Sequence, residues 1–243
     1  IIKIIRDVKY FNLWQKRSKS YKYETFTINQ KMTELKKSDF KTIFSYLEQL
    51  FPNADTELNY ETPFQLLVAV ILSAQTTDKQ VNKVTATLFQ TIKQPEDVLK
   101  LGHPAFEQAI KSIGLYKGKA KNIYQTSELL LAKKGKIPKT TSELIKLPGV
   151  WEKTAKVVLH VLYKKPVIAV DTHVHRICNR LGIVQTKTPL QTSKLLETVI
   201  PNKYKQIAHH CIILFWRYYC TARKPKCTEC QLQKICLYFN SKK

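Results

Sequence analysis

The sequence predicts an all-α protein on two observations. Apolar residues recur at spacings of three and four through most of the chain, and no segment alternates apolar and polar residues as a half-buried strand does. Proline- and glycine-containing turns such as FPNAD, LGHP and KGKIPKT separate the periodic segments. We therefore expect helices at 40–51, 64–74, 81–89, 105–113, 120–132, 142–147, 151–163, 171–181, 190–199 and 205–218.

The chain begins with a basic segment, residues 1–31, that has eight basic and two acidic residues and no sustained period. The only methionine, Met32, opens the first periodic segment. We predict a loosely ordered basic tail before Met32.

The most apolar segment, FQLLVAVILSA over 64–74, is about half as long as a membrane-spanning helix. We expect a buried core helix and no membrane partner. The N-terminus also lacks the pattern of a secretory signal.

A proline–glycine turn, LPGV, leads directly into the helix expected at 151–163. Gly149 permits a positive φ, and a helix start presents free N–H groups to an anion, which predicts a phosphate-binding hairpin. The helical phase places Lys153, Lys156, His160 and Lys164 on one polar face, and Ala155, Val158, Leu159 and Leu162 on an apolar stripe. Helix geometry alone favours an ordinary solvated lysine at Lys153.

Asp171 follows an apolar run and stands at the start of the next helix, where it is typical of a helix N-cap. Cys178 and Cys211 lie in apolar helical contexts and are expected to be buried core thiols.

The composition is strongly basic, with 41 Lys and Arg against 18 Asp and Glu and a formal charge of +23. A polyanionic partner is the natural interpretation, with DNA or RNA ahead of an anionic membrane. The alternative is a soluble lysine-rich protein without such a partner.

The C-terminal segment carries the pattern C-x6-C-x2-C-x5-C, formed by Cys220, Cys227, Cys230 and Cys236. Four cysteines so close together indicate a metal centre, and their spacing is compatible with zinc or with a [4Fe–4S] cluster. The loop between the first two contains Arg223, Lys224 and Lys226, which suits contact with phosphates.

Taken together, the motifs resemble the endonuclease III family of helix-hairpin-helix DNA glycosylases and abasic-site lyases. They occur in the family's order over 32–243: TELNYETPFQLLVAVILSAQTTDKQVNK, IGLYKGKAKNI, LPGV followed by KTAKVVL, IAVDTH, and the cysteine pattern. The resemblance implies a two-lobed all-α fold, with a six-helix barrel over 57–165 and a cluster lobe from 32–56 plus 166–243. It also implies a [4Fe–4S] cluster on the four cysteines, and damaged double-stranded DNA lying between the lobes.

The resemblance further implies a bifunctional enzyme of base excision repair that removes oxidised pyrimidines and cleaves the abasic site by β-elimination. Lys153 matches the family's nucleophile and Asp171 its aspartate, while Gln75 and Leu115 match the residues that fill the space of the extruded base. Desolvation and the helix dipole favour the neutral amine of Lys153, and a nearby Asp171 opposes them.

Further DNA contacts are expected at Lys117, Lys119, Gly149, Val150, Arg223, Lys224 and Lys226. We expect a monomer, located in the cytoplasm with the nucleoid if the source is bacterial or archaeal. Two other functions stay open: a mismatch-specific glycosylase of the same superfamily, and a non-catalytic DNA-binding iron–sulfur protein.

Two residues of the hairpin depart from the family's pattern. Trp151 stands where glycine is usual, and Glu152 where a basic residue is common. If the helix has begun by Trp151, its phase aligns it with Ala155, Val158 and Leu162, which predicts that the indole packs in the core. The alternative places the indole at the tip of the hairpin, where it stacks on a base or shields Lys153.

Overall fold

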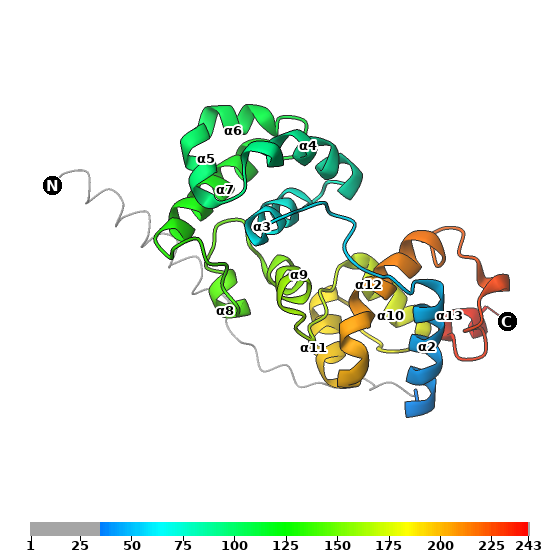
Figure 1. Ribbon diagram of the computed structural model, residues 1–243. Coiled ribbons are helices and arrows are strands. Elements are labelled where there is room, and N and C mark those ends of the chain that lie inside the picture. The colour runs from blue at the N-terminus through cyan, green and yellow to red at the C-terminus, as the bar shows by residue number, and fades with distance from the viewer. Residues whose placement is uncertain (1–34, 243) are drawn as a thin grey trace. The chain divides into compact units, whose positions relative to one another are not determined.

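The computed structural model describes residues 35–242, so the predicted basic tail lies outside the described residues. Within that range the chain forms α-helices and one 3₁₀ helix and has no strand, as the sequence predicts (Figure 1). The elements are α2 (Lys37–Leu50), α3 (Pro63–Leu72), α4 (Asp78–Thr91), α5 (Pro95–Leu101), α6 (His103–Ala109), α7 (Tyr116–Leu131), α8 (Thr141–Leu144), α9 (Glu152–Tyr163), α10 (Thr172–Leu181), α11 (Pro189–Val199), α12 (Asn202–Tyr218), the 3₁₀ helix η1 (Cys227–Glu229) and α13 (Leu237–Asn240).

The sequence prediction lacks three short elements: η1, α13 and the longest of them, α5. It has only seven residues and begins at Pro95, so it offers too short a periodic segment to detect. Pro95 stands in the first turn, where its missing N–H is tolerated, and Gly102 ends the helix with a φ of 81°.

Threonine side chains set several helix starts. Thr62, Thr77, Thr140 and Thr188 each accept a hydrogen bond from the backbone N–H three residues later. At α3 the cap is reciprocal, because Gln65 accepts from the N–H of Thr62 at 3.1 Å. Its buried amide also donates to the carbonyls of Phe89 and Ile92, which ties α3 to the end of α4.

The first hydrophobic core draws its buried residues from Leu58 to Val161. Its centre is α3, in which every residue from Phe64 to Leu72 is buried. This confirms the core helix predicted at 64–74. α3 packs against α4, α7 and α9, and α5 against α7. No helix in the described part of the chain combines the length and apolar character needed to cross a membrane.

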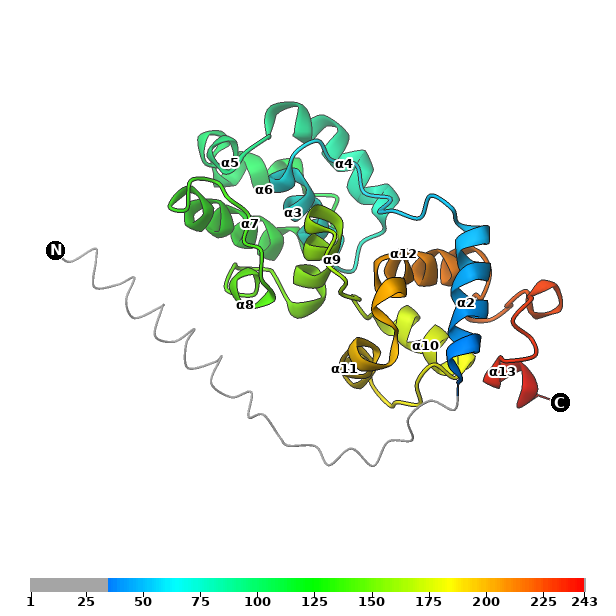
Figure 2. The same cartoon turned by 60° about the horizontal axis from the view of Figure 1, so that its bottom comes forward.

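The second core joins the N-terminal helix α2 to the C-terminal part of the chain. Its buried residues run from Phe40 to Leu47 and from Ile168 to Cys236. α2 packs against α12, which it crosses in Figure 2, and α10 contacts α11, α12 and α13. Cys178 and Cys211 are buried here, as predicted.

α9 belongs to the first core and contacts residues of the second through its polar face. The Nζ atom of Lys156 lies 2.8 Å from Ser193 Oγ and 2.5 Å from a Glu197 carboxylate oxygen, both on α11. His160 contacts the rings of His209 and His210 on α12. Lys156 and His160 are therefore buried, although the helical phase places them on one polar face with the exposed Lys153.

Candidate active site and cluster site

The starts of α9 and α10 bring Lys153 and Asp171 together. Lys153 lies in the first turn of α9 and Asp171 caps α10, and Lys153 Nζ is 3.2 Å from Asp171 Oδ2. The lysine side chain is 51% exposed and the aspartate side chain 23%. An amine beside a half-buried carboxylate is thus accessible to a ligand from one side.

Asp171 uses its two carboxylate oxygens differently. Oδ1 accepts hydrogen bonds from the N–H groups of His173 at 2.9 Å and Val174 at 2.8 Å, while Oδ2 faces Lys153. Burial by itself raises the pKa of this carboxyl, but the charge of Lys153 and the N–H of Val174 outweigh it, so the pKa lies below its usual value. Asp171 is therefore an anion at neutral pH. Asp171 therefore both caps α10 and pairs with Lys153.

Asp78, which sequence reasoning missed, is the first residue of α4 and lies close enough to Lys153 for their charges to interact. Burial raises its pKa, and the nearby charge of Lys153 opposes this shift. Arg217 of α12 donates to Asp78 Oδ2 at 3.0 Å and also pairs with Glu57. The signal in the sequence is an aspartate directly after a threonine cap, which is indistinguishable from an ordinary first-turn acid.

The hairpin before α9 is held by a few specific contacts. Thr126 Oγ1 donates to the carbonyl of Pro148 at 2.9 Å. Gly149 has a φ of 79°, and a Cβ atom there would lie 3.0 Å from Cβ of Asn122. Both the backbone conformation and the space therefore require glycine at this turn. The side chain of Val150 is buried, and its backbone N–H donates to the carbonyl of Leu147. Val150 therefore has no free backbone N–H for a ligand, and any such donor must come from the residues beside it.

Trp151 is 71% exposed, so the prediction of a core indole is wrong. The helix begins at Glu152, and Trp151 is its N-cap in an extended conformation with φ −95° and ψ 170°. Helical phase does not apply to a residue outside the helix, which explains the error. The indole makes no capping hydrogen bond, which leaves the first N–H groups of α9 without a side-chain acceptor.

Gln75 and Leu115 share an uncommon backbone conformation. Both are exposed and left-handed, with φ values of 56° and 59°. Their loops adjoin, because a Cβ atom on Gly114 would lie 3.6 Å from the carbonyl oxygen of Gln75. A left-handed leucine is strained and leaves an apolar side chain, 67% exposed, at a loop tip.

The two lysines expected beside Leu115 differ. Lys117 is exposed. Lys119 is buried, and its Nζ atom donates to the carbonyls of Leu72 at 2.8 Å and Ala74 at 2.6 Å, which caps the end of α3. Burial lowers its pKa. The prediction that Lys119 contacts DNA is therefore corrected: it holds the loop of Gln75.

The four cysteines line one pocket, together with Leu181, Phe215, Tyr219, Pro225, Lys226, Gln233, Tyr238 and Phe239. Burial raises the pKa of Cys220, Cys230 and Cys236, so their thiolates need a cationic partner, which iron supplies. A pocket lined by four cysteines fits a [4Fe–4S] cluster, which is held by four thiolates.

Arg180, the last-turn arginine of α10, braces this pocket and was not predicted. Its Nη1 atom lies 3.5 Å from Cys220 Sγ, and its guanidinium donates to the carbonyls of Thr221 and Ala222, both at 2.9 Å. These contacts anchor the loop that follows Cys220. The loop exposes Arg223, Lys224 and Lys226, as predicted.

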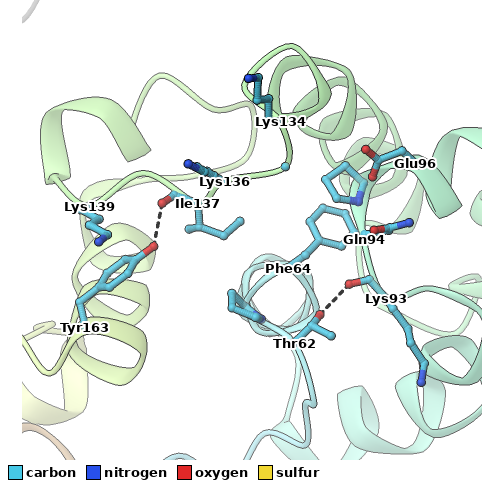
Figure 3. Close-up of a pocket in the computed structure, with 13 residues that line it drawn as sticks. Thr62, Phe64, Lys93, Gln94, Glu96, Lys134, Lys136, Ile137, Lys139 and Tyr163 are labelled. Atoms are coloured by element: carbon cyan, nitrogen blue, oxygen red, sulfur yellow. Dashed lines mark hydrogen bonds between the residues drawn. The ribbon is translucent and has the colours of Figure 1, made fainter.

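A second pocket, of about 350 Å³, lies apart from this site (Figure 3). Its lining includes Phe64, Lys134, Lys136 and Tyr163, and Tyr163 donates to the carbonyl of Ile137 at 2.7 Å. It forms where α3 begins and α9 ends, whereas Gln75 follows the end of α3 and Lys153 lies at the start of α9. The pocket is therefore at the opposite ends of these helices from the candidate site.

Known proteins share both the sequence pattern and the fold. Residues 68–202 match the family described as HhH-GPD superfamily base excision DNA repair protein, and residues 220–236 the iron–sulfur binding domain of endonuclease III. Endonuclease III of Bacillus subtilis is 46% identical over 84% of this chain and 94% of its own, and that of Escherichia coli K12 is 44% identical over 81% and 93%.

A solved structure of a trapped covalent intermediate of endonuclease III with DNA superposes with a TM-score of 0.79 at 42% identity, covering 86% of this chain and 99% of the other. The match over 220–236 runs from Cys220 to Cys236, and the chain carries a [4Fe–4S] cluster, as predicted. The chain belongs to the endonuclease III family.

Proposed function

We propose that this protein is a bifunctional DNA glycosylase and abasic-site lyase of base excision repair that removes oxidised pyrimidines from damaged duplex DNA. The observation that carries the proposal is the Lys153–Asp171 pair at 3.2 Å, with the amine half exposed at a helix start. Family membership adds the reaction class, since a relative's structure was solved as a covalent intermediate with DNA.

The chemistry needs one amine. The neutral Nζ of Lys153 attacks C1′ of the damaged nucleotide, and the base leaves with the electrons of the C1′–N bond. Opening of the sugar and loss of a proton from nitrogen give a Schiff base. Removal of a C2′ proton then expels the 3′ phosphate, and hydrolysis of the Schiff base frees the lysine.

Asp171 supports the early step. As an anion held by two backbone N–H groups, it stabilises positive charge that develops at the sugar and receives the proton that leaves the amine. The hydrogen bonds that cap α10 fix its orientation, so Oδ2 stays directed at Lys153.

Gln75 and Leu115 act on the duplex. A base must leave the stack before C1′ can be attacked, and the vacated space has to be filled. A polar plug and an apolar wedge on adjoining strained loops suit that task. Lys119 holds the loop of Gln75 in place by donating hydrogen bonds to the carbonyls at the end of α3.

DNA lies between the two lobes, which we assign to 57–165 and to 32–56 plus 166–243, in agreement with the two hydrophobic cores. The free N–H groups at Gly149 and at the start of α9, together with Lys117, Arg223, Lys224 and Lys226, bind its phosphates. The bound cluster, held by Cys220, Cys227, Cys230 and Cys236, fixes the fold of the basic loop. We infer that the protein works as a monomer and, if its source is bacterial or archaeal, in the cytoplasm with the nucleoid.

Borohydride reduction in the presence of an abasic duplex tests the proposal, because it traps a Schiff base covalently. The wild type should form the adduct, and Lys153→Gln should lose both the adduct and abasic-site cleavage. The variant should retain DNA affinity within about tenfold, since one charge is a small part of the electrostatic term. Lys100→Gln, an exposed lysine of α5, is the matched control.

Cleavage by Lys153→Gln at the wild-type rate would place the nucleophile elsewhere. Base removal without any adduct from the wild type would favour a mismatch-specific glycosylase, and DNA binding without either reaction would favour a non-catalytic protein.

A further inference from the structure

Trp151 is the most exposed large apolar side chain in the described part of the chain, at 71%. The next is Leu115, at 67%, which is the proposed wedge into DNA. Both residues precede a helix directly, as the N-cap residues of α9 and α7. Trp151 therefore shares its exposure and its place before a helix with the residue proposed to enter DNA.

The N-cap position gives no structural reason for tryptophan. Helix starts favour Ser, Thr, Asp or Asn there, and the indole makes no capping bond. The hairpin that carries it is nevertheless fixed, by the Thr126 bond to Pro148 and by the close packing of Gly149 on Asn122. A rigid turn therefore presents a solvated indole.

Lys153 follows Trp151 by two residues. Side chains on a helix lean toward its N-terminus, so the amine of Lys153 extends toward the level of the N-cap. Because Trp151 is the N-cap of the same helix, we expect a deoxyribose in contact with that amine to bring a neighbouring nucleotide to the indole. The amine is 51% exposed without DNA, and an apolar ring beside it would remove water from it on binding.

We propose that Trp151 is a DNA-contacting positioning residue whose indole packs on a nucleotide next to the damaged one and covers the Lys153 amine. This proposal rests on the proposed function, which places DNA at Lys153. It assigns a role to a residue that stands where the family usually has glycine.

Tryptophan fluorescence tests the contact directly. The chain has three tryptophans, Trp14, Trp151 and Trp216, and Trp216 stacks on His173 with ring centroids 3.5 Å apart. Subtracting the emission of Trp151→Phe from that of the wild type isolates the indole in question. With a duplex that contains a tetrahydrofuran abasic analogue, this emission should become shielded from acrylamide. Unchanged quenching at saturating DNA would overturn the proposal.

Affinity gives a second readout. Trp151→Ala should bind the same duplex about 5- to 150-fold more weakly, the range expected for loss of one base–aromatic stack. Trp151→Phe should retain most of the affinity, and Leu129→Ala, which truncates an exposed leucine of α7, should bind as the wild type does. Wild-type affinity of Trp151→Ala would contradict the contact.

Stability separates this role from a structural one. Trp151→Ser introduces a capping hydroxyl, so its melting temperature should rise while DNA binding weakens. A fall in both would indicate a packing role and overturn the proposal. If the wild type forms no borohydride adduct, the proposed function fails, whereas an adduct with unaltered tryptophan quenching refutes only the role of Trp151.

Discussion

A single carboxylate can be a helix cap and a catalytic group when its two oxygens face different partners. Asp171 binds two N–H groups through Oδ1 and Lys153 through Oδ2. Its sequence position predicted the cap from local chemistry alone. The 3.2 Å approach to Lys153 depends on how α9 and α10 meet, which local rules do not specify.

Asp171→Asn should separate the two roles. Asparagine caps helices as well as aspartate does, so the melting temperature should stay close to that of the wild type. Loss of the charge should slow base removal and leave abasic-site cleavage comparatively active. Single-turnover rates on both substrates check this, with Asp171→Ala as the variant that also loses about 1 kcal/mol of stability with the cap. Equal slowing of both reactions would contradict the assignment to the first step.

Replacing Gly149 or Gly118 by alanine should change the free energy of unfolding in opposite directions. Gly149→Ala should destabilise the protein by more than about 1 kcal/mol, because φ is 79° and the new Cβ would press on Asn122. Gly118→Ala should stabilise by about 0.5–1 kcal/mol, because Gly118 lies inside α7 with no atom near its missing Cβ. Denaturant unfolding measures both, and the same sign for the two changes would show that the hairpin is less constrained than its contacts indicate.

At the scale of elements, periodicity located the long helices but could not tell which surfaces become covered. α9 is amphipathic in sequence, yet Lys156 and His160 on its polar face are buried because α11 and α12 supply their partners. Lys119 illustrates the same limit, since a lysine beside a predicted DNA contact caps α3 instead. One residue of uncertainty in a helix start was enough to misplace Trp151.

The buried histidines between α9 and α12 predict a loss of stability in acid. Burial lowers the pKa of His160 and His209, and that of His210 to about 4, with the neighbouring imidazoles adding to the effect at His209 and His210. Between the ordinary value near 6.5 and these lower values, the unfolded chain binds more protons than the folded one. Stability is therefore fully present above about pH 6.5 and falls as the pH is lowered.

His210→Asn should flatten this dependence, as followed by thermal unfolding between pH 7 and pH 5. His103→Asn is the control, because His103 lies in α6 beside Tyr124, away from the cluster of histidines. An identical slope in His210→Asn and the wild type would remove these imidazoles from the explanation.

At the scale of the whole molecule, the composition of the sequence predicted the class of partner. The formal charge of +23 indicates a polyanion, and the described chain places exposed Arg223 and Lys224 on a loop fixed by Arg180 and the cluster pocket. Cluster type was open from spacing alone. The match to the iron–sulfur binding domain of endonuclease III over 220–236 decided it.

The salt dependence of DNA binding tests the basic loop. Each phosphate contact contributes a slope of about −0.9 to log K against log salt concentration. Arg223→Ala and Lys224→Ala should each make the slope less steep by about that amount, and Lys100→Ala should leave it unchanged. Titrations of one duplex at several salt concentrations give the slopes. Slopes equal to that of the wild type would place the loop outside the DNA contact.

The central claim is that the amine of Lys153 attacks the sugar. Borohydride trapping on an abasic duplex, followed by protease digestion and mass spectrometry of the DNA-linked peptide, locates the modified atom directly. The adduct should map to Lys153 in the peptide that contains Trp151 and Glu152. An adduct on another lysine, or on the N-terminal amine, would contradict the account.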